Sequence, residues 1–564
     1  MRSPWVAWFS RPWAAPLIAA LLMAWPVLPL LGVPPIGGTE GHRVMPARAM
    51  LATGDFLVPE LVGEAYLRKP PGHFWLIAAS QSLFGENAWA WRLPSALSAM
   101  ALAACLAWFG RRWYGATGGW AAGVSCVALV AMWSQSRTAD IDAANTLASV
   151  VAAMVLLELT VRRPTRRWLW GLLLAAAMGA TLLLKLHGGL SLVGGALLAG
   201  AMVGGLRSIG RPSVWLGLMG GAGLFLAWAV PVALRVGEAG DTRGVAEASQ
   251  NLLRADRLIG ALRAQGELLL FAMPFTVGLL LTPRLLQKPD FAGVLSERRR
   301  ITLVVLLTLG LGHALLLLNG VTNPRYGYVL LPMWAMLAAA VAAAWRDGRL
   351  SHPHRKLVEW TLAVTAVALP VTAVVLAGMI RRDPPTGFTA QPWLSAAFML
   401  GPAAAIASLL AWGANRWALG TAGAVAGVLV LALPLVVMHT QQRVERSGQA
   451  AGRVMAGALP AGAVVVADAL VRDKPEVFLY AEGVTGQSRG GLFDDPSAVA
   501  LPAGTYIGLT QREWQRWQQA DRTLPLDRLC QLPTRPDRPA VLAAVAERKA
   551  VTTPPGPPSP PAAP

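Results

Sequence analysis

Charged and polar side chains of types that handle phosphate esters interrupt the apolar stretches of this 564-residue chain. Lys69 precedes Pro70-Pro71, and Lys185 lies within LLLKLHGGL with no other charge near it in sequence. Asp140 and Asp142 stand just before an apolar run. Lysine and arginine suit a phosphate or pyrophosphate ester, and a carboxylate beside them could take a proton from an attacking hydroxyl. These residue types could move a group from a lipid phosphate to an acceptor.

Further polar residues lie where other apolar stretches begin or end, and each has an ordinary structural alternative. An aspartate before an apolar helix is often its N-cap, and a lone lysine can extend its amine to the membrane surface. A loop histidine is commonly hydrogen-bonded, while a loop glutamate or a flanking arginine can simply be solvated. The candidates added here are Glu40, His42, Arg254, Arg325, Tyr326 and Tyr328.

The elements that must position these residues are long apolar runs. About 55% of the residues are apolar and 14% are charged, against roughly 25% charged in a soluble domain. Many runs reach the roughly 18 to 20 residues that cross a hydrocarbon core. The sequence therefore predicts an all-α polytopic membrane protein with thirteen spans, at 13–33, 91–110, 116–134, 142–161, 167–184, 188–206, 213–234, 267–286, 301–319, 326–345, 358–379, 394–412 and 417–438.

Short, densely basic loops predict the orientation of these spans. With the N-terminus inside, clusters such as Arg111-Arg112, Arg162-Arg163 and 298–300 all fall in inner loops, as the positive-inside rule requires. All the candidate residues then lie on the outer side. The same clusters account for the net charge of +19, and no basic face with interleaved aromatic residues points to nucleic acid. The three cysteines form no disulfide or metal-binding pattern.

The chain is predicted to have three parts. Residues 1–440 form the transmembrane domain, whose first span is interpreted as an uncleaved helix, with a cleavable signal peptide as the competing interpretation. Residues 441–551 form a small outer α/β domain, and 552–564 a disordered proline-rich tail. The first outer loop, 34–90, is long for a bundle connection. The elements expected outside the spans are interface helices at Arg43–Leu51 and Phe74–Phe84, strands at Ala463–Ala467 and Val477–Tyr480, and a helix at Gln511–Arg522.

The first outer loop resembles a known family. The stretch Thr39–Leu97 has an acidic start followed in order by ARAML, TGDF-VP-L, Y-KPP, LFG and RLPSAL. It resembles the first outer loop of the aminoarabinose transferase and protein mannosyltransferase superfamily, whose members are membrane glycosyltransferases of the GT-C fold that use polyprenyl-phosphate sugars. The resemblance continues through SRTADIDAANTL, LLLKLHGGL and NPRYGYVLLP, and covers roughly residues 10–345.

The resemblance implies roles for positions in the first loop. Thr39 stands where the family has its essential aspartate, so the neighbouring Glu40 is the residue expected to replace it. His42-Arg43 stands where the aminoarabinose transferases have Arg-Tyr. Lys69 matches the lysine of the family's Glu-Lys-Pro-Pro, but Arg68 replaces the glutamate, which contributes to a metal site in some members. No cofactor is certain, and a divalent metal is left open with no ligand assigned.

The resemblance also covers three later positions. Asp142 matches an aspartate of the second outer loop. Lys185 matches a lysine of the third, although Leu186 stands where a glycine usually follows. Tyr326 and Tyr328 are both candidates for a tyrosine that precedes Leu-Leu-Pro.

The sequence therefore predicts a glycosyltransferase of the bacterial inner membrane with its active site facing the periplasm. It would transfer a sugar from a polyprenyl-phosphate donor to a lipid, glycan or protein acceptor, and the resemblance implies inversion at the anomeric carbon. The donor phosphate is expected between Lys69, Lys185 and Arg325, with Glu40 or Asp142 orienting or deprotonating the acceptor. Two alternatives remain: a lipid or solute transporter or flippase, and an inactive relative that acts as a scaffold.

Overall fold

The computed structural model describes residues 11–186, 188–237, 255–286, 297–382, 390–413, 417–445, 447–488, 501, 504–519, 526–534 and 540–545. The chain forms two compact units. Unit 1 comprises Met1–Pro35, His42–Glu60 and Ala65–Glu445, and is helical. Unit 2 comprises Ile36–Gly41, Leu61–Glu64 and Arg446–Pro564, and contains a β-sheet.

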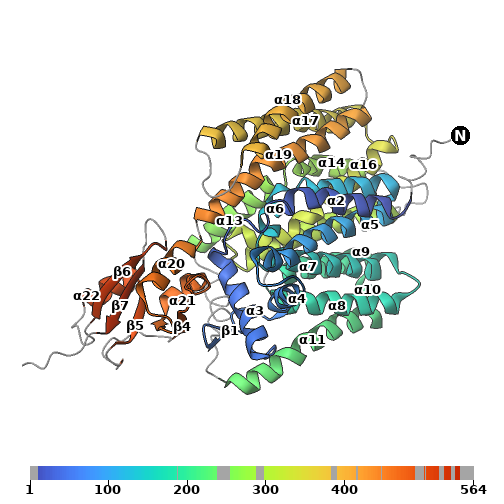
Figure 1. Ribbon diagram of the computed structural model, residues 1–564. Helices are drawn as coiled ribbons and strands as arrows, with labels where there is room; N and C mark the ends of the chain where they lie inside the picture. The colour runs from blue at the N-terminus through green and yellow to red at the C-terminus, as the bar shows by residue number, and fades with distance from the viewer. Residues whose placement is uncertain are drawn as a thin grey trace, which may run out of the picture. The chain divides into compact units, whose positions relative to one another are not determined.

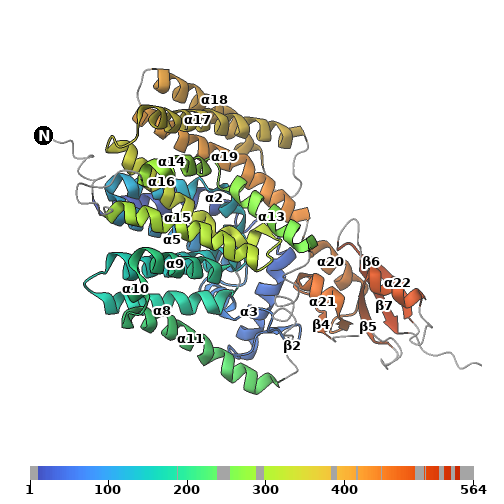
Figure 2. The same cartoon turned by 180° about the vertical axis from the view of Figure 1, so that it is seen from behind.

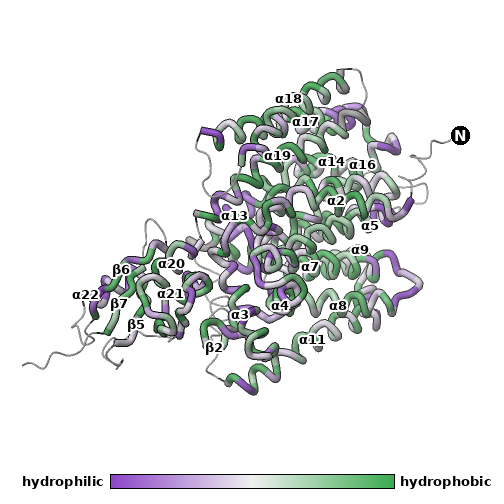
Figure 3. The backbone as a smooth tube through the Cα atoms, in the orientation of Figure 1, coloured by the Kyte–Doolittle hydropathy of each residue, from purple (hydrophilic) through white to green (hydrophobic). Residues whose placement is uncertain are grey.

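Unit 1 is a bundle of apolar helices that lie side by side (Figures 1 and 2). By length and composition, nine of the described helices can cross a membrane, or up to ten if the bent pair Leu258–Phe271 and Phe275–Leu281 is one span. Two further apolar helices, Ala14–Val27 and Gly189–Gly204, are shorter. Figure 3 shows hydrophobic residues along the middle of these helices and hydrophilic residues gathered at their ends and in the connections. The predicted all-α polytopic membrane fold is confirmed.

The helices of unit 1 follow the predicted spans in order, and every predicted span overlaps one of them. They are α2 (Ala14–Val27), α3 (Gly41–Thr53), α4 (Gly72–Phe84), α5 (Ala88–Val127), α6 (Val130–Ser136), α7 (Asp142–Leu157), α8 (Arg167–Leu184), α9 (Gly189–Gly204), α10 (Leu206–Ile209), α11 (Pro212–Val236), α13 (Ala255–Phe271), α14 (Gly278–Leu286), α15 (Glu297–Leu318), α16 (Leu331–Arg346), α17 (His352–Arg382), α18 (Gln391–Gly413) and α19 (Trp417–Glu445). Short helical turns of other types are η2 (Glu158–Arg162), η4 (Phe275–Val277) and η5 (Pro324–Leu330).

The long helix α5 is two antiparallel helices joined by a tight reversal at Gly115. Gly115 has a φ of 83°, a conformation that glycine adopts without the strain a side chain would add. A Cβ at Gly110 would lie 2.6 Å from the carbonyl oxygen of Gly118, so the two arms touch backbone to backbone. The arms correspond to the second and third predicted spans, but the third ends at Val127, and the separate helix α6 follows it.

The first span is shorter than predicted, and buried arginines bind the carbonyl groups beyond its end. Leu28, the C-cap of α2, still has helical φ and ψ, but the following Pro29 offers no backbone N–H to continue the helix. Arg137 donates to the carbonyl oxygens of Pro26 and Val27 at 3.0 and 3.2 Å. Arg92, which is fully buried, donates to carbonyl oxygens of the following turn at 2.6 to 3.0 Å. These charged donors satisfy carbonyls that a helix end leaves without partners.

The eighth predicted span, 267–286, is wrong as a single helix. α13 ends at Phe271, and the chain turns by 97° before it continues through η4 and α14. Pro274 lies at this turn and offers no backbone N–H to a helix. The sequence predicts one helix over 267–286 because most of its residues are apolar, and apolar composition does not show whether the helix axis bends within a run.

Unit 2 contains a five-stranded mixed sheet in the order β4-β3-β5-β7-β6. The strands are β3 (Val464–Ala467), β4 (Thr485–Ser488), β5 (Tyr506–Thr510), β6 (Leu526–Leu532) and β7 (Ala540–Val545), and the helices are α20 (Gln449–Ala458), α21 (Ala469–Asp473) and α22 (Gln511–Gln519). β3 runs parallel to β4 and β5, whereas β7 runs antiparallel to β5 and β6. The predicted C-terminal α/β fold is confirmed, including the first strand and the described part of the polar helix.

The second predicted strand, Val477–Tyr480, is wrong. Pro475–Val477 is a 3-10 turn, η6, and the backbone N–H groups of Phe478 and Tyr480 donate to carbonyls three residues back. These donors are therefore used within local turns and are not available to a sheet. The apolar run instead packs its valine into the core, where Val477 is fully buried.

Candidate active site

Two aspartates stand at the start of helix α7, and a serine of the RLPSAL motif helps to hold the backbone there. Asp142 is the first residue of α7, and Asp140 lies two residues earlier. The hydroxyl of Ser95, from the RLPSAL motif on α5, donates to the backbone carbonyl of Asp140 at 2.9 Å. The backbone N–H of Ile141 donates to Oδ1 of Asp140 at 2.8 Å. Both aspartates are buried, so their charges require close partners.

Lys185 and Arg325 supply the partners of these carboxylates from two distant parts of the chain. Lys185 follows the last residue of α8, and its Nζ lies 2.6 Å from Oδ1 of Asp142. Arg325, in η5, donates to Oδ2 of Asp142 through Nε and to Oδ2 of Asp140 through Nη2. The ammonium of Lys185 also lies 4.1 Å from the ring centroid of Tyr326, a cation–π contact. The structure thus brings together Asp140, Asp142, Lys185, Arg325 and Tyr326.

The glycine after the lysine motif allows these two segments to meet. Gly188 has a φ of 77°, and a Cβ at this position would lie 2.3 Å from the carbonyl oxygen of Tyr326. Any side chain here would push the turn that carries Lys185 away from η5, and it would strain the backbone. The first glycine of the Gly-Gly in LLLKLHGGL is therefore explained by the close approach of two backbones.

Arg43 and Tyr66 also belong to the cluster, although sequence reasoning did not select them. Nε of Arg43 lies 3.4 Å from Oδ1 of Asp140, and Nη1 donates to the hydroxyl of Tyr66 at 3.1 Å. Nη1 also donates to the backbone carbonyl of His42 at 3.2 Å. The signal that could have found them was their place in the family-like loop, one beside His42 and the other in the Y-KPP motif.

Lys69 is a fourth cation, and it differs from the other three. Within the described part of the chain it makes no hydrogen bond and no ion pair, and its side chain is only partly exposed. Burial and then the positive charges of Lys185 and Arg43 lower the pKa of Lys69 to about 8, while the two aspartates act in the opposite direction. The Lys-Pro-Pro-Gly motif that contains Lys69 packs closely against the end of α8, which precedes Lys185. A Cβ at Gly72 would lie 2.8 Å from the carbonyl oxygen of Leu183 on α8.

The cluster therefore has an excess of positive charge. Four cations, Arg43, Lys69, Lys185 and Arg325, face two carboxylates, which leaves a net charge of +2 among these six side chains. Fixed guanidinium and ammonium groups with this excess are suited to a phosphate or pyrophosphate group. The site lies at one end of the bundle, where apolar helices meet polar loops, so it could hold a lipid-linked phosphate.

Comparison with known proteins connects this geometry to a family. Residues 68–232 match the family described as dolichyl-phosphate-mannose-protein mannosyltransferase. The chain is similar to the undecaprenyl phosphate-alpha-4-amino-4-deoxy-L-arabinose arabinosyl transferases of Aeromonas salmonicida (31% identity over 136 residues, 24% of each chain) and of Pseudomonas savastanoi pv. phaseolicola (38% over 86 residues, 14% of this chain and 15% of the relative). The aligned part spans about a quarter or less of the length of these curated relatives.

The fold is similar along almost the whole chain. The crystal structure of ArnT from Cupriavidus metallidurans bound to undecaprenyl phosphate superimposes with a TM-score of 0.64 at 18% identity, covering 96% of this chain and 98% of that one. The chain therefore has the GT-C fold of this structure, and residues 68–232 match the mannosyltransferase family. The resemblance that the first loop predicted is confirmed.

Glu40 and His42 have different surroundings in this GT-C protein. Glu40 is fully buried in unit 2, where its Oε2 accepts a hydrogen bond from the backbone N–H of Gly37 at 3.2 Å. His42 belongs to unit 1, and its ring centroid lies 6.1 Å from that of Tyr66. Arg254 lies outside the described residues.

Tyr328, unlike Tyr326, lines a mainly apolar cavity. Its ring packs edge-on against Phe271 at 5.8 Å between centroids. The cavity has a volume of about 440 Å³ and is bordered by α2, α6, α13 and α19. Arg137 and His439 are among its few polar neighbours. Of the two candidate tyrosines of η5, Tyr326 therefore lies at the ion cluster and Tyr328 at the cavity.

The described residues do not fit a bound divalent metal. No group of three or more His, Cys, Asp or Glu side chains in the described ranges is arranged to hold one. Asp140 and Asp142 are instead bound to Arg43, Lys185 and Arg325. The cations of the chain itself occupy the positions around these oxygens that a metal would need.

Proposed function

We propose that this GT-C protein is a glycosyltransferase that moves a sugar from a polyprenyl-phosphate donor to an acceptor of the cell envelope. The observation that carries the proposal is the cationic cluster with its net charge of +2, in which Lys69 has no described ion-pair partner. The similarity of part of the chain to proteins named for undecaprenyl phosphate-linked sugar transfer supports it. A lipid-linked sugar phosphate supplies the negative charge that the cluster lacks.

In this proposal the phosphate of the donor binds to Lys69 and to the exposed part of the Arg325 guanidinium, which is 28% exposed at its side chain. The mainly apolar cavity beside Tyr328 accommodates the first isoprenoid units. The acceptor oxygen attacks the anomeric carbon, the bond from that carbon to the phosphate oxygen breaks, and its electron pair stays on the phosphate. Fixed cations stabilise this charge more in the transition state than in the ground state.

The carboxylates have separate proposed roles. Both oxygens of Asp142 are used by cations, Oδ1 by Lys185 and Oδ2 by Arg325. Asp142 therefore positions the phosphate-binding groups, and it could accept the acceptor's proton only if one of these ion pairs opened. Glu40 as acceptor base stays a prediction that requires its buried carboxylate to become accessible. A phosphate acceptor would need no base, because it is already ionised.

The test uses purified protein in lipid nanodiscs with radiolabelled polyprenyl-phosphate sugars and membrane extract. We expect label to move into an acceptor fraction, and Lys69→Met to lower this transfer about 100-fold. Arg48→Gln is a matched control, because Arg48 is paired with Glu86 at 2.6 Å outside the cluster. Translocation of the donor without a new covalent product would indicate a flippase, and binding without either would indicate an inactive scaffold.

We further propose that the site faces the periplasm across the bacterial inner membrane. The basic loops lie at the end of the helices opposite to the cluster, as in a protein with its positive loops inside. A cysteine introduced at the exposed Thr165, in one of these loops, should react with an impermeant maleimide only after the inner membrane is permeabilised. Labelling in intact spheroplasts would reverse the orientation.

A further inference from the structure

A second cationic site lies at the other end of the bundle. α16 begins beside η5, which carries Arg325, and sixteen residues later it ends at Arg346. At about 1.5 Å per residue this helix separates its two ends by roughly 24 Å. A cavity of about 270 Å³ opens at the far end, between α5, α14, α15 and the turn after α16. It shares no lining residue with the candidate active site.

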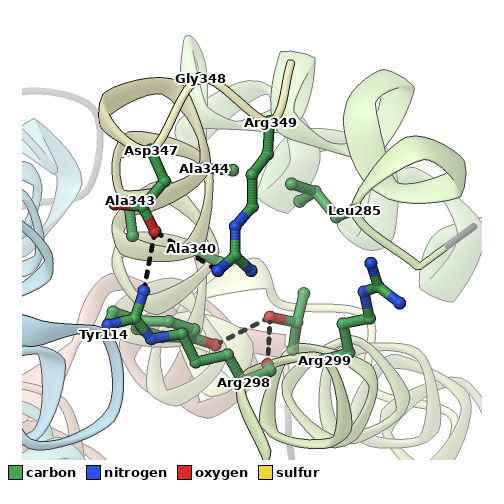
Figure 4. A pocket seen from close by; sticks show the side chains of 11 residues that line it. Tyr114, Leu285, Arg298, Arg299, Ala340, Ala343, Ala344, Asp347, Gly348 and Arg349 are labelled. Atoms are coloured by element: carbon green, nitrogen blue, oxygen red, sulfur yellow. Dashed lines mark hydrogen bonds and ion pairs between the residues drawn. The ribbon is translucent and has the colours of Figure 1, made fainter. Parts of the chain in front are cut away.

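Three described arginines line this cavity, and one carboxylate pairs with two of them (Figure 4). Arg298 donates to Oδ2 of Asp347 at 2.8 Å, and Nη2 of Arg349 lies 3.7 Å from the same oxygen. Nη1 of Arg299 is buried and has no hydrogen-bond partner among the described residues. Among the described residues that line the cavity, three guanidinium groups and one carboxylate leave a net charge of +2.

Two other arginines at this end of the bundle, Arg112 and Arg162, have their own acidic partners. Arg112 and Arg162 both bind the fully buried Glu158, at 2.8 and 3.3 Å, and Arg162 also binds Glu297 at 2.6 Å. These two arginines are balanced by two glutamates, whereas the three arginines of the cavity share a single aspartate among the described lining residues.

Neutral groups of the cavity add hydrogen-bonding capacity and an apolar wall. The hydroxyl of Tyr114, at the end of the first arm of α5, lies 3.3 Å from Oγ1 of Thr302. The hydroxyl of Thr302 already donates to the backbone carbonyl of Arg298 at 2.9 Å, so its oxygen can accept from Tyr114. Alanines of α16 and Leu285 of α14 form the remaining wall. This combination is suited to an anionic group that carries a small apolar substituent.

We propose that this cavity is a binding site for a phosphate group, contributed either by the headgroup of an anionic lipid or by a small soluble phosphate. Arginine forks bind phosphate oxygens with two parallel hydrogen bonds. The volume is below the roughly 300–1,000 Å³ typical of pockets for larger ligands, so a headgroup fits better than a nucleotide. The position at the polar end of apolar helices is the depth at which lipid phosphates lie.

Native mass spectrometry of the full-length protein tests the lipid source. The protein is offered equal amounts of phosphatidic acid, phosphatidylglycerol and phosphatidylcholine, and the lipid retained is measured. We expect retention of the anionic lipids, with about tenfold weaker binding in Arg299→Gln and in Arg349→Gln. Arg166→Gln is the matched control, because Arg166 is an exposed arginine of the same face outside the cavity. Equal binding by all three variants would overturn the lipid site.

Calorimetric titration of delipidated protein with inorganic phosphate tests the soluble source. Phosphate binding that is lost in Arg299→Gln and Arg349→Gln, but kept in Arg166→Gln, would assign the cavity to a soluble phosphate. Arg299→Lys keeps every charge but removes the forked donors, and should weaken whichever ligand binds about fivefold, which guards against variants that fail to fold. If neither lipid retention nor phosphate binding depends on Arg299 and Arg349, the proposal is wrong.

Discussion

Replacing Lys69 with methionine removes the cation of the active-site cluster that has no ion-pair partner in the described part of the chain. The substitution keeps most of the side-chain volume and leaves the pairs of Lys185, Arg325 and Arg43 with the aspartates intact. A hydrogen bond between charged groups contributes about 1.5–3 kcal/mol. We therefore expect the affinity for a polyprenyl-phosphate sugar to fall roughly 10- to 150-fold.

The pH dependence of binding gives the same residue a second readout. In the free protein the pKa of Lys69 is lowered to about 8, first by burial and then by Lys185 and Arg43. A bound anion favours the charged ammonium, so the pKa rises on binding and a proton is taken up. Affinity should be constant below pH 8 and should fall about tenfold per pH unit above it, until the pKa of the bound state is reached.

Microscale thermophoresis in nanodiscs between pH 6.5 and 9.5 would measure both effects. The sugar-phosphate donor is a diester and does not titrate in this range, and comparison with Lys69→Met subtracts the contribution of other protein groups. We expect the variant to bind weakly with an affinity that changes little across the range. Wild-type affinity that stays level to pH 9.5, together with unchanged affinity in Lys69→Met, would refute the assignment of Lys69 to the phosphate.

Three other substitutions test the structure around the two units. Asp142→Asn leaves Lys185 buried without its carboxylate, and should destabilise the fold by about 3–5 kcal/mol; an unchanged melting temperature in detergent would contradict this. Gly188→Ala should cost about 1–3 kcal/mol of strain and weaken donor binding, because its Cβ would lie 2.3 Å from the carbonyl oxygen of Tyr326; normal donor affinity would show that the two segments can separate freely. Burial raises the pKa of Glu476 to about 7. Folded unit 2 therefore holds this proton more tightly than the unfolded chain does. Its free energy of unfolding should fall by roughly 3 kcal/mol as pH rises from 4.5 to 7. Glu476→Gln should abolish this fall, as measured by hydrogen exchange of β3 at matched pH. An equal pH dependence in the wild type and the variant would argue against titration of Glu476 as the cause.

The parts of the site that could be predicted from sequence are those that mark the ends of apolar runs. Asp142, Lys185 and Arg325 each interrupt or border a span, and a consistent orientation of the spans is enough to put them on one side of the membrane. Their direct pairing within hydrogen-bond distance depends on helix packing, which periodicity does not encode. The same limit explains why Arg43 and Tyr66 were missed, since their partners lie in loops whose course is set by tertiary contacts.

The surroundings of Glu40 could not be predicted for a related reason. Its place at the start of an outer loop predicted an accessible carboxylate, but the adjoining Gly38 donates its backbone N–H to Glu476 at 3.1 Å, across 438 residues of sequence. No local sequence pattern predicts a contact between residues so far apart in the chain. By contrast, the short first span and the bend near Phe271 were readable in principle, because Pro29 and Pro274 stand at those positions.

The discontinuous composition of unit 2 affects how this protein could be dissected or recombined. The chain enters unit 2 at Ile36–Gly41 and again at Leu61–Glu64, long before the C-terminal part begins at Arg446. Gly37 forms a β-bridge with Ser447, and the N–H of Ile36 donates to the hydroxyl of Tyr480. A stop codon after unit 1 would therefore leave two loop segments without the partners that fold them. A chimaera that exchanges this unit between relatives would have to carry three separate stretches of coding sequence together.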